Sequence, residues 1–370
     1  MTIASIVNTL SNLRARSQAR QRSHPPQPGS TAEIRRQVLR LAIPAAGEQM
    51  LSMMVGIVDT YLVGHLSAAS LAAVGLATQW VFMAITLFIA VSTGSTALVA
   101  RAIGARDAST VQRVVRQSVS LGVLMGCAAT LLVQLFAQPA IAIMGAEQET
   151  LHLGVTYLRI AACVFPLSAL MFIGNACLRG AGDTRTPLYI MLVVNFINVA
   201  VAWALINGPF GLPRLGVAGS ALGAVAGRTV GGILALLILL RGRGGLRLRL
   251  QPLRLEGDII RRILRVGLPA GMERLLFRLG YMSFVRVVAS LGTAAYAAHQ
   301  IALNGESLSF MPGFGFAIAG TTLVGQGLGA QDPERAECSG YMAYRLGATL
   351  MGIMGIIFFC LLYTSPSPRD

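Results

Sequence analysis

LRLAIPAAGE (residues 39–48) is followed 225 residues later by LRVGLPAGME (264–273), and TALVARAIGARD (96–107) recurs in the same register as TTLVGQGLGAQD (321–332). The shorter segment LAAVGLA (71–77) likewise falls on YAAHQIA (296–302). Between 36–107 and 261–332, about 19 of 72 aligned positions are identical without a gap. Repetition over such a distance predicts two related bundles built from one ancestral unit.

The composition excludes an ordinary soluble protein. Hydrophobic residues make up 54 % of the 370 residues and charged residues only 12 %, with a mean hydropathy of +0.66, whereas a soluble globule carries about 25 % charged residues. A spanning helix needs roughly 20 mostly apolar residues, and helices satisfy their own backbone in lipid. The sequence therefore predicts an all-α, multi-pass membrane protein with nine spans, near 38–62, 71–100, 117–137, 153–175, 187–206, 216–240, 263–289, 295–324 and 341–363.

The arginines predict the orientation. When successive loops are assigned alternately to the two sides of the membrane, 23 of the 30 arginines lie on the side of the N-terminus and only Arg214 lies in the loops on the opposite side. Positive residues accumulate in cytoplasmic loops, so we expect a cytoplasmic N-terminus in a bacterial inner membrane. The basic residues punctuate apolar runs and do not cluster on a polar domain, which argues against a nucleic-acid partner.

The repeat also predicts the domains. Six helices per bundle is an even number, so both bundles begin on the same side and are related by an axis along the membrane normal. The second bundle would extend to about residue 465 if it matched the first, so we interpret it as incomplete at its C-terminal end and the last ten residues as non-native. The expected units are a basic tail (1–34), a six-helix lobe (35–241), an arginine-rich cytoplasmic linker (242–260), three helices of a second lobe (261–360) and the tail 361–370.

Three further segments carry a family resemblance. VDTYLVGHLSAASLAAVGLA (58–77), RGAGDTRTP (179–187) and LSFMPGFGFAIAGTTLVGQGLGA (308–330) resemble multidrug and toxic compound extrusion (MATE) transporters of the prokaryotic branch, over about residues 35–360. The resemblance implies twelve helices in two lobes around a cavity. It also implies a monomer without enzymatic activity or cofactor that exports amphiphilic, often cationic compounds in exchange for protons or sodium ions. Related flippases of lipid-linked oligosaccharides are the alternative, and a non-transporting membrane protein is a further one.

Two carboxylates of the first helix are candidates for cation coupling. An ionisable side chain at membrane depth is costly, so it is a functional candidate by default. Asp59, in the VDT motif, resembles the coupling aspartate in the N-terminal lobe of some MATE proteins; otherwise it is a helix-end aspartate that faces water. Glu48 lies nearer the midplane, and its counterpart Glu273 leaves open that both residues brace their lobes.

Other polar residues predict a substrate cavity. Asn195 and Asn198 share one helix face and either face the cavity near Asp59 or hold helices together. Gln79 and Trp80 could offer an amide and an aromatic wall to a cationic drug. The complete expected set is Gln79, Trp80, Asn175, Asn195, Asn198, Glu273, Asn304 and Glu306.

Arg274 and Arg278 lie one turn apart in the second lobe, and we expect Glu273 or Glu306 to neutralise them. Phe277 stands where the best-known sodium-coupled pattern of the family has a glutamate, which puts sodium coupling through this lobe in doubt.

Pro44 and Pro269 occupy matching positions in their helices, and a proline removes an amide donor and clashes with the preceding turn. We expect a kink at each, either static or close to the binding region. Gly180-Ala-Gly182-Asp183 matches the GxGD motif of intramembrane aspartyl proteases, but a second aspartate at similar depth is not evident. The histidines and cysteines lack metal-ligand spacing, so no metal site is expected.

Overall fold

The structure is a computed structural model that describes residues 28–144, 148–208, 214–242, 246, 248, 255–290 and 293–364, without some side chains, chiefly between 279 and 309. All secondary structure in these residues is helical, as predicted. The helices are α2 (Pro28–Gly64), α3 (Ala68–Gly104), α4 (Ala108–Ala142), α5 (Gln148–Ala162), α6 (Phe165–Gly180), α7 (Arg185–Asn207), α8 (Val217–Arg241), α9 (Gly257–Ser290), α10 (Thr293–Gly329) and α11 (Pro333–Thr364).

Most of the predicted spans correspond to one helix each, but the span at 153–175 does not. It consists of α5 and α6, which are bent by 54° at a short break. Pro166 stands in the first turn of α6, where its missing amide is tolerated; the expected span is present as a bent pair, and its bend was not predicted.

Six of the described helices, α2, α3, α4, α7, α8 and α11, are long and apolar enough to cross a membrane, and the bent pair makes a seventh. Helix α9 carries five arginines and one glutamate between residues 261 and 278, which lowers its hydropathy. The side chains in the middle of α10 lie outside the described residues.

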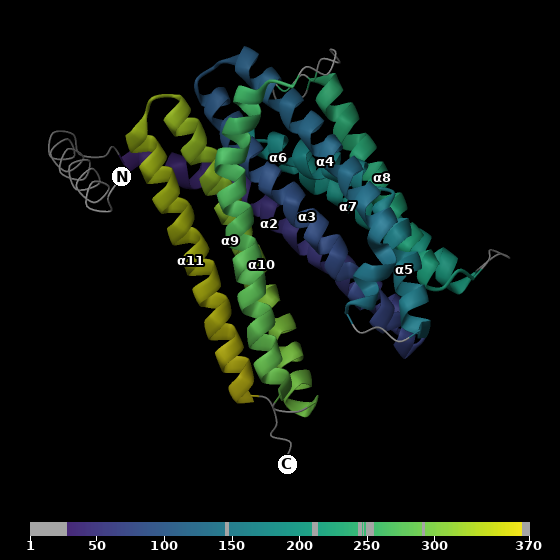
Figure 1. Ribbon diagram of the computed structural model, residues 1–370. Coiled ribbons are helices and arrows are strands. Elements are labelled where there is room, and N and C mark those ends of the chain that lie inside the picture. Colours follow the sequence, from purple (N-terminus) through teal and green to yellow (C-terminus); the bar gives the residue numbers. More distant parts are fainter. Residues whose placement is uncertain are drawn as a thin grey trace, which may run out of the picture.

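The helices form two groups in space. Helices α3 to α8 lie on one side and α9, α10 and α11 on the other; the groups adjoin at the end that carries the turns after α3 and α10 and diverge at the opposite end (Figure 1). Helix α2 crosses between them, packing on both α7 and α10.

Contacts between the two groups follow the sequence repeat. A Cβ atom on Gly267 of α9 would lie 2.3 Å from the carbonyl oxygen of Ala90 in α3, and one on Gly315 of α10 would lie 2.6 Å from that of Ala42 in α2. In the repeat register Gly267 corresponds to Ala42 and Gly315 to Ala90. The α3–α9 and α2–α10 contacts are therefore the same contact with the lobes exchanged. This exchange confirms the parallel repeat.

The turns that end α3 and α10 also match. Arg106 and Gln331, equivalent in the repeat, have positive φ angles of 56° and 58°. Each is followed by an aspartate that caps the next helix: Thr110 N donates to Asp107 Oδ1 and Arg335 N donates to Asp332 Oδ1, both at 3.0 Å. Hydrogen bonds from Thr110 and Ser109 hold the pKa of the Asp107 carboxyl well below its usual range.

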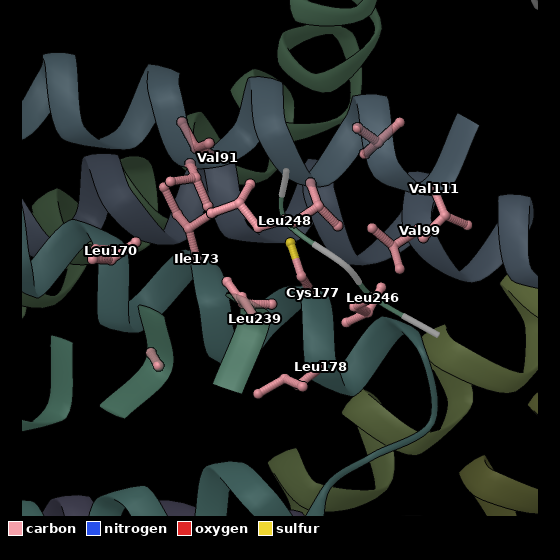
Figure 2. Close-up of a cluster of buried hydrophobic side chains, with 14 of the residues drawn as sticks. Val91, Val99, Val111, Leu170, Ile173, Cys177, Leu178, Leu239, Leu246 and Leu248 are labelled. Atoms are coloured by element: carbon pink, nitrogen blue, oxygen red, sulfur yellow. The ribbon is translucent and has the colours of Figure 1, made fainter. Parts of the chain in front are cut away.

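Two leucines of the predicted linker belong to the core of the first lobe. Leu246 and Leu248 are 0 % and 7 % exposed, and Figure 2 shows both among Val99, Cys177 and Leu239. The amide of Leu248 also donates to the carbonyl of Leu239 at 2.9 Å. The linker is therefore partly docked, which an arginine-rich loop alone does not predict.

Candidate functional site

A polar cluster surrounds Asp59 inside the first lobe. The carboxylate of Asp59 (α2) hydrogen-bonds with the side chain of Asn198 (α7), and the charge of Arg228 (α8) acts on it. Arg228 and Asp59 both act in turn on Tyr157 (α5), whose hydroxyl hydrogen-bonds with Thr78 (α3). Five helices therefore contribute to one site, which we call the Asp59 cluster.

Two oxygens of the cluster lack hydrogen-bond partners. Asp59 Oδ1 and Asn198 Oδ1 are buried, and neither has a hydrogen-bond partner among the described residues. A buried polar atom left unsatisfied costs about 1–3 kcal/mol. The two oxygens are therefore ready acceptors for a proton, a small cation or a donor group of a substrate.

A glycine allows α8 to pack closely against α7 next to Arg228. A Cβ on Gly227 would lie 2.8 Å from the carbonyl oxygen of Val194 and 3.2 Å from Cβ of Asn198. Small residues allow membrane helices to approach closely. Gly227 thus lets α8 pack closely against α7, and the charge of the next residue, Arg228, acts on Asp59.

The two neighbouring amides of α7 take the two roles that the sequence left open. Asn198 contacts Asp59, whereas Asn195 donates from Nδ2 to the carbonyl of Leu51 at 2.8 Å and so ties α7 to α2. Asn175 is 3 % exposed in α6 with Oδ1 unpartnered. Its described contacts do not join it to the cluster.

Glu48 has a different environment from Asp59. Its Oε1 lies 2.7 Å from Nη1 of Arg179 in α6, with side-chain exposures of 11 % and 15 %. Burying both charges is tolerable because each is paired. This geometry favours the bracing role for Glu48, and its counterpart Glu273 is exposed, so the two equivalent residues differ in environment.

The same segment of α6 binds the second lobe. Thr322 of α10 donates from Oγ1 to the carbonyl of Arg179 at 3.0 Å, and Gln326 donates from Nε2 to the carbonyl of Gly180 at 3.2 Å. These hydrogen bonds join the lobes at the end where Figure 1 shows them adjoining.

Two glycines form a symmetric crossing beside these hydrogen bonds. A Cβ on Gly104 of α3 would lie 2.0 Å from the carbonyl oxygen of Gln326, and one on Gly329 of α10 would lie 2.0 Å from that of Arg101. Gly104 and Gly329 are equivalent in the repeat. The sequence predicts that this motif is repeated but does not predict that it forms the crossing point of the lobes.

Comparison with known proteins identifies the family. The family model described as MatE matches residues 44–204 and 269–365. The chain belongs to the MatE family.

Relatives and solved structures agree with this assignment. The chain is 36 % identical over 338 residues to the "Probable multidrug resistance protein NorM" of Thermotoga maritima, covering 91 % of this chain and 72 % of that protein. It is 33 % identical to the "Multidrug resistance protein NorM" of Burkholderia vietnamiensis, over 86 % and 69 % of the two chains. The structure titled "Outward-facing conformation of a multidrug resistance MATE family transporter of the MOP superfamily" superposes with a TM-score of 0.82 at 25 % identity, covering 90 % of this chain and 72 % of that one. The predictions of a MATE fold and of a membrane transporter in place of an enzyme are confirmed.

In the second lobe of this MATE protein, the two arginines take partners other than those expected. Arg278 hydrogen-bonds to Oε1 of Gln79 in α3 and lies 5.8 Å from the ring centroid of Phe82. Arg274 lies 5.9 Å from the ring centroid of Phe314. Cation–π contacts of this kind are attractive, and they link α9 to α3 and α10.

The acids expected to neutralise these arginines do not pair with them among the described ion pairs. Glu273 and Glu306 are both exposed, so the predicted ion-pair network is wrong for the part of the chain that the structure describes. The side chain of Asn304 lies outside the described residues. Gln79, by contrast, connects the lobes of this MATE protein through Arg278.

Trp80 is placed for packing. Its indole N–H donates to the carbonyl of Ala140 in α4 at 3.1 Å, and its ring packs on the buried cluster around Phe88 and Phe165. This placement favours an anchor between α3 and α4 over the expected aromatic wall.

Neither of the two prolines breaks its helix in this MATE protein. Pro44 and Pro269 stand inside the continuous helices α2 and α9.

The protease-like motif has a structural explanation. Asp183 accepts hydrogen bonds from the amide and the hydroxyl of Thr186, at 3.0 and 2.6 Å, and so caps the start of α7. The described residues contain no group of His, Cys, Asp and Glu side chains that could hold a metal ion.

Proposed function

We propose that this chain is a secondary antiporter of the bacterial cytoplasmic membrane, acting as a monomer with a cytoplasmic N-terminus. It exports amphiphilic, cationic drugs or metabolites in exchange for protons or sodium ions, and Asp59 is the coupling carboxylate. The observation that carries the proposal is the unpartnered, buried oxygen of Asp59 inside a cluster drawn from five helices. The multidrug resistance proteins among its relatives support the substrate class.

Coupling follows from competition for one carboxylate. An ionised Asp59 attracts a cationic substrate, and protonation from outside removes that attraction, so the substrate leaves. The membrane potential adds about 2.3 kcal/mol per inward charge at 100 mV.

The contacts between the lobes suggest which state is present. They gather at the ends of α3 and α10, near Gly104 and Gly329, and the lobes diverge at the other end (Figure 1). With a cytoplasmic N-terminus, this arrangement is closed to the cytoplasm and open to the outside. Transport then requires the crossing of α3 and α10 to separate while the opposite end closes.

The test is ethidium efflux from proteoliposomes driven by an imposed proton or sodium gradient. Asp59→Asn keeps the size of the side chain but removes the titratable group, so gradient-driven export should be lost. Asp258→Asn is the matched control, because Asp258 forms only an exposed pair with Arg262. Full export by Asp59→Asn would show that Asp59 is not the coupling site.

One observation supports the flippase alternative. Arg274 and Arg278 are exposed in the second lobe and lack acidic partners among the described ion pairs, so they could bind a pyrophosphate. Movement of a fluorescent lipid-linked pyrophosphate across the liposome membrane, with loss in Arg274→Gln and no ethidium efflux, would favour this alternative. The capping role of Asp183 argues against a protease.

A further inference from the structure

We propose that a groove on the exposed face of α9 binds the phosphate of an anionic phospholipid from the surrounding bilayer. The groove is shallow and has a volume of about 440 Å³, within the range of about 300–1,000 Å³ that is typical of small-molecule sites. Two arginines and several apolar or small residues line it: Gly257, Ile260, Arg261, Leu264, Arg265 and Leu268. Binding of this kind requires only a chain that spans a membrane, so it is independent of the transported substrate and of the coupling ion.

The groove lies on the side of α9 that faces away from α3. The opposite side packs on α3, because Ile263 is fully buried and a Cβ on Gly94 would lie 3.1 Å from its Cγ2. In a helix of 3.6 residues per turn, Arg261 and Arg265 stand about 160° around the axis from Ile263. Both arginines are exposed, so their guanidinium groups are accessible to a lipid at the surface of the protein.

The two arginines of the groove have no acidic partner among the described ion pairs. The two acids at the start of α9 are paired elsewhere: an oxygen of Glu256 lies 2.5 Å from Nη2 of Arg116, and one of Asp258 lies 3.1 Å from Nη2 of Arg262. The groove therefore carries two uncompensated positive charges one helical turn apart. Guanidinium groups form strong, often bidentate hydrogen bonds with phosphate, so this pair is suited to one headgroup.

The apolar residues of the groove point to a lipid and not to a free anion. Leu264 and Leu268 each follow one of the two arginines by three residues, which places them about 4.5 Å further along α9 toward the membrane interior. From Gly257 to Leu268 the groove extends over about 17 Å, whereas the headgroup layer of one leaflet is only about 5–8 Å thick. A phospholipid would therefore contact the arginines through its phosphate and the leucines through its acyl chains.

The equivalent face of the first lobe is exposed in the same way. In the repeat register, the two arginines and the last leucine of the groove correspond to Arg36, Arg40 and Ile43 of α2. All three are exposed although α2 packs on both α7 and α10; Ile43 is 64 % exposed and Leu268 is 59 % exposed. A basic face that continues into apolar residues is thus a property of both repeats.

The positive-inside rule also accounts for arginines at this end of α9, because it requires positive charge near the ends of membrane helices. That rule sets no requirement on which residues carry the charge. A headgroup site, by contrast, depends on Arg261 and Arg265 and not on their neighbour Arg262, which pairs with Asp258 and does not line the groove. The two explanations therefore differ in which arginine matters.

The test measures lipid binding by the full chain in detergent, without a substrate or an ion gradient. A ligand that binds the folded state raises the unfolding temperature, so this temperature is followed while phosphatidylglycerol or phosphatidylcholine is titrated into the micelles. Phosphatidylglycerol should bind about 10-fold more tightly than phosphatidylcholine, because only its headgroup carries a net negative charge.

Matched variants locate the site. Arg261→Gln and Arg265→Gln should each weaken phosphatidylglycerol binding by about 10-fold, because each removes a charge-assisted hydrogen bond. Arg262→Gln is the control: it removes the same charge from the adjacent position, where Asp258 already holds the guanidinium, and should weaken binding by less than about 3-fold. Leu268→Ala should weaken binding by about 5-fold through lost contact with an acyl chain.

Three results would overturn the proposal. Equal affinities for the two lipids would show no preference for a negative headgroup, and equal losses in all three arginine variants would show a diffuse attraction to the basic surface. Inorganic phosphate that competes as well as the lipid would show a simple anion site. All three arginines are exposed, so these variants should unfold at the wild-type temperature without lipid, and either groove variant alone suffices for the comparison.

Discussion

The crossing of α3 and α10 predicts that one methyl group on either glycine opens the closed end of the transporter. In Gly329→Ala the new Cβ would lie 2.0 Å from the carbonyl oxygen of Arg101 and 3.0 Å from the amide nitrogen of Ala105. Gly104→Ala would place its Cβ 2.0 Å from the carbonyl oxygen of Gln326. Each obstacle is backbone, so a change of side-chain rotamer cannot relieve the clash.

The size of the effect follows from these distances. Ordinary contact begins near 3.4 Å, so the two helices must separate by about 1.4 Å where the Cβ would otherwise lie 2.0 Å away. Overpacking of this kind costs about 1–3 kcal/mol. The cost applies only to the state in which the lobes meet here. The equilibrium should therefore shift toward the state that opens at this end by about 5- to 150-fold.

The shift is measurable as a distance between the two turns. Spin labels at Ala108→Cys and Glu334→Cys, two exposed positions just after the turns, report the separation by pulsed electron resonance once the five native cysteines are replaced. Gly329→Ala should increase the population of long distances. Gly75→Ala is the control, because Gly75 lies in α3 with nothing within 4 Å of its would-be Cβ, so alanine there only raises helix propensity. Identical distance distributions in Gly329→Ala and Gly75→Ala would refute the crossing as the point of closure.

Three further substitutions test the structural assignments. Glu48→Gln should leave Arg179 buried without its charge partner and destabilise the protein by about 3–5 kcal/mol, measured as a lower unfolding temperature. Ligands that bind at Asp59 should not restore the stability that this substitution removes. Trp80→Phe should cost about 1 kcal/mol through its lost hydrogen bond and leave the KM for ethidium efflux unchanged, whereas a large rise in KM would restore the cavity-wall hypothesis. Leu246→Ala should cost about 2–5 kcal/mol by opening a cavity, while the same change at the half-exposed Leu255 should cost much less; equal effects would contradict docking of the linker.

The architecture could be predicted because membrane helices and internal repeats are recognised in the sequence without knowledge of tertiary contacts. The apolar runs predict the helices without tertiary information, and the repeat register pairs residues such as Gly104 and Gly329 before any coordinates are known. The bend between α5 and α6 has a signal in the sequence, because Pro166 follows Phe165 in the middle of an apolar run, but the length of that run by itself predicts only a spanning segment. The buried leucines of the linker also have a signal, because leucine and arginine alternate in LRLRL (246–250) and such alternation is typical of a segment with one apolar face.

The site was less predictable because depth in the membrane does not determine partners. Glu48 and Asp59 lie on one helix, and each has one buried oxygen without a hydrogen-bond partner, yet Glu48 forms a direct ion pair with Arg179 at 2.7 Å whereas Asp59 is in none of the described ion pairs. The difference comes from α6 and α8, more than 100 residues away in the sequence, and no local pattern places Arg179 or Arg228 beside its acid.

The contrast between these two acids has a physical consequence for the transport cycle. A carboxylate in a direct, buried ion pair is poorly suited to exchange ions at each cycle, because its release would leave an uncompensated arginine at a cost of several kcal/mol. A carboxylate whose arginine acts from beyond contact distance can gain or lose a proton while its neighbours stay in place. Glu48 therefore suits the permanent joint between α2 and α6, next to the hydrogen bonds from Thr322 that connect the lobes. Asp59 suits the exchangeable site, and the two functions are separated along a single helix.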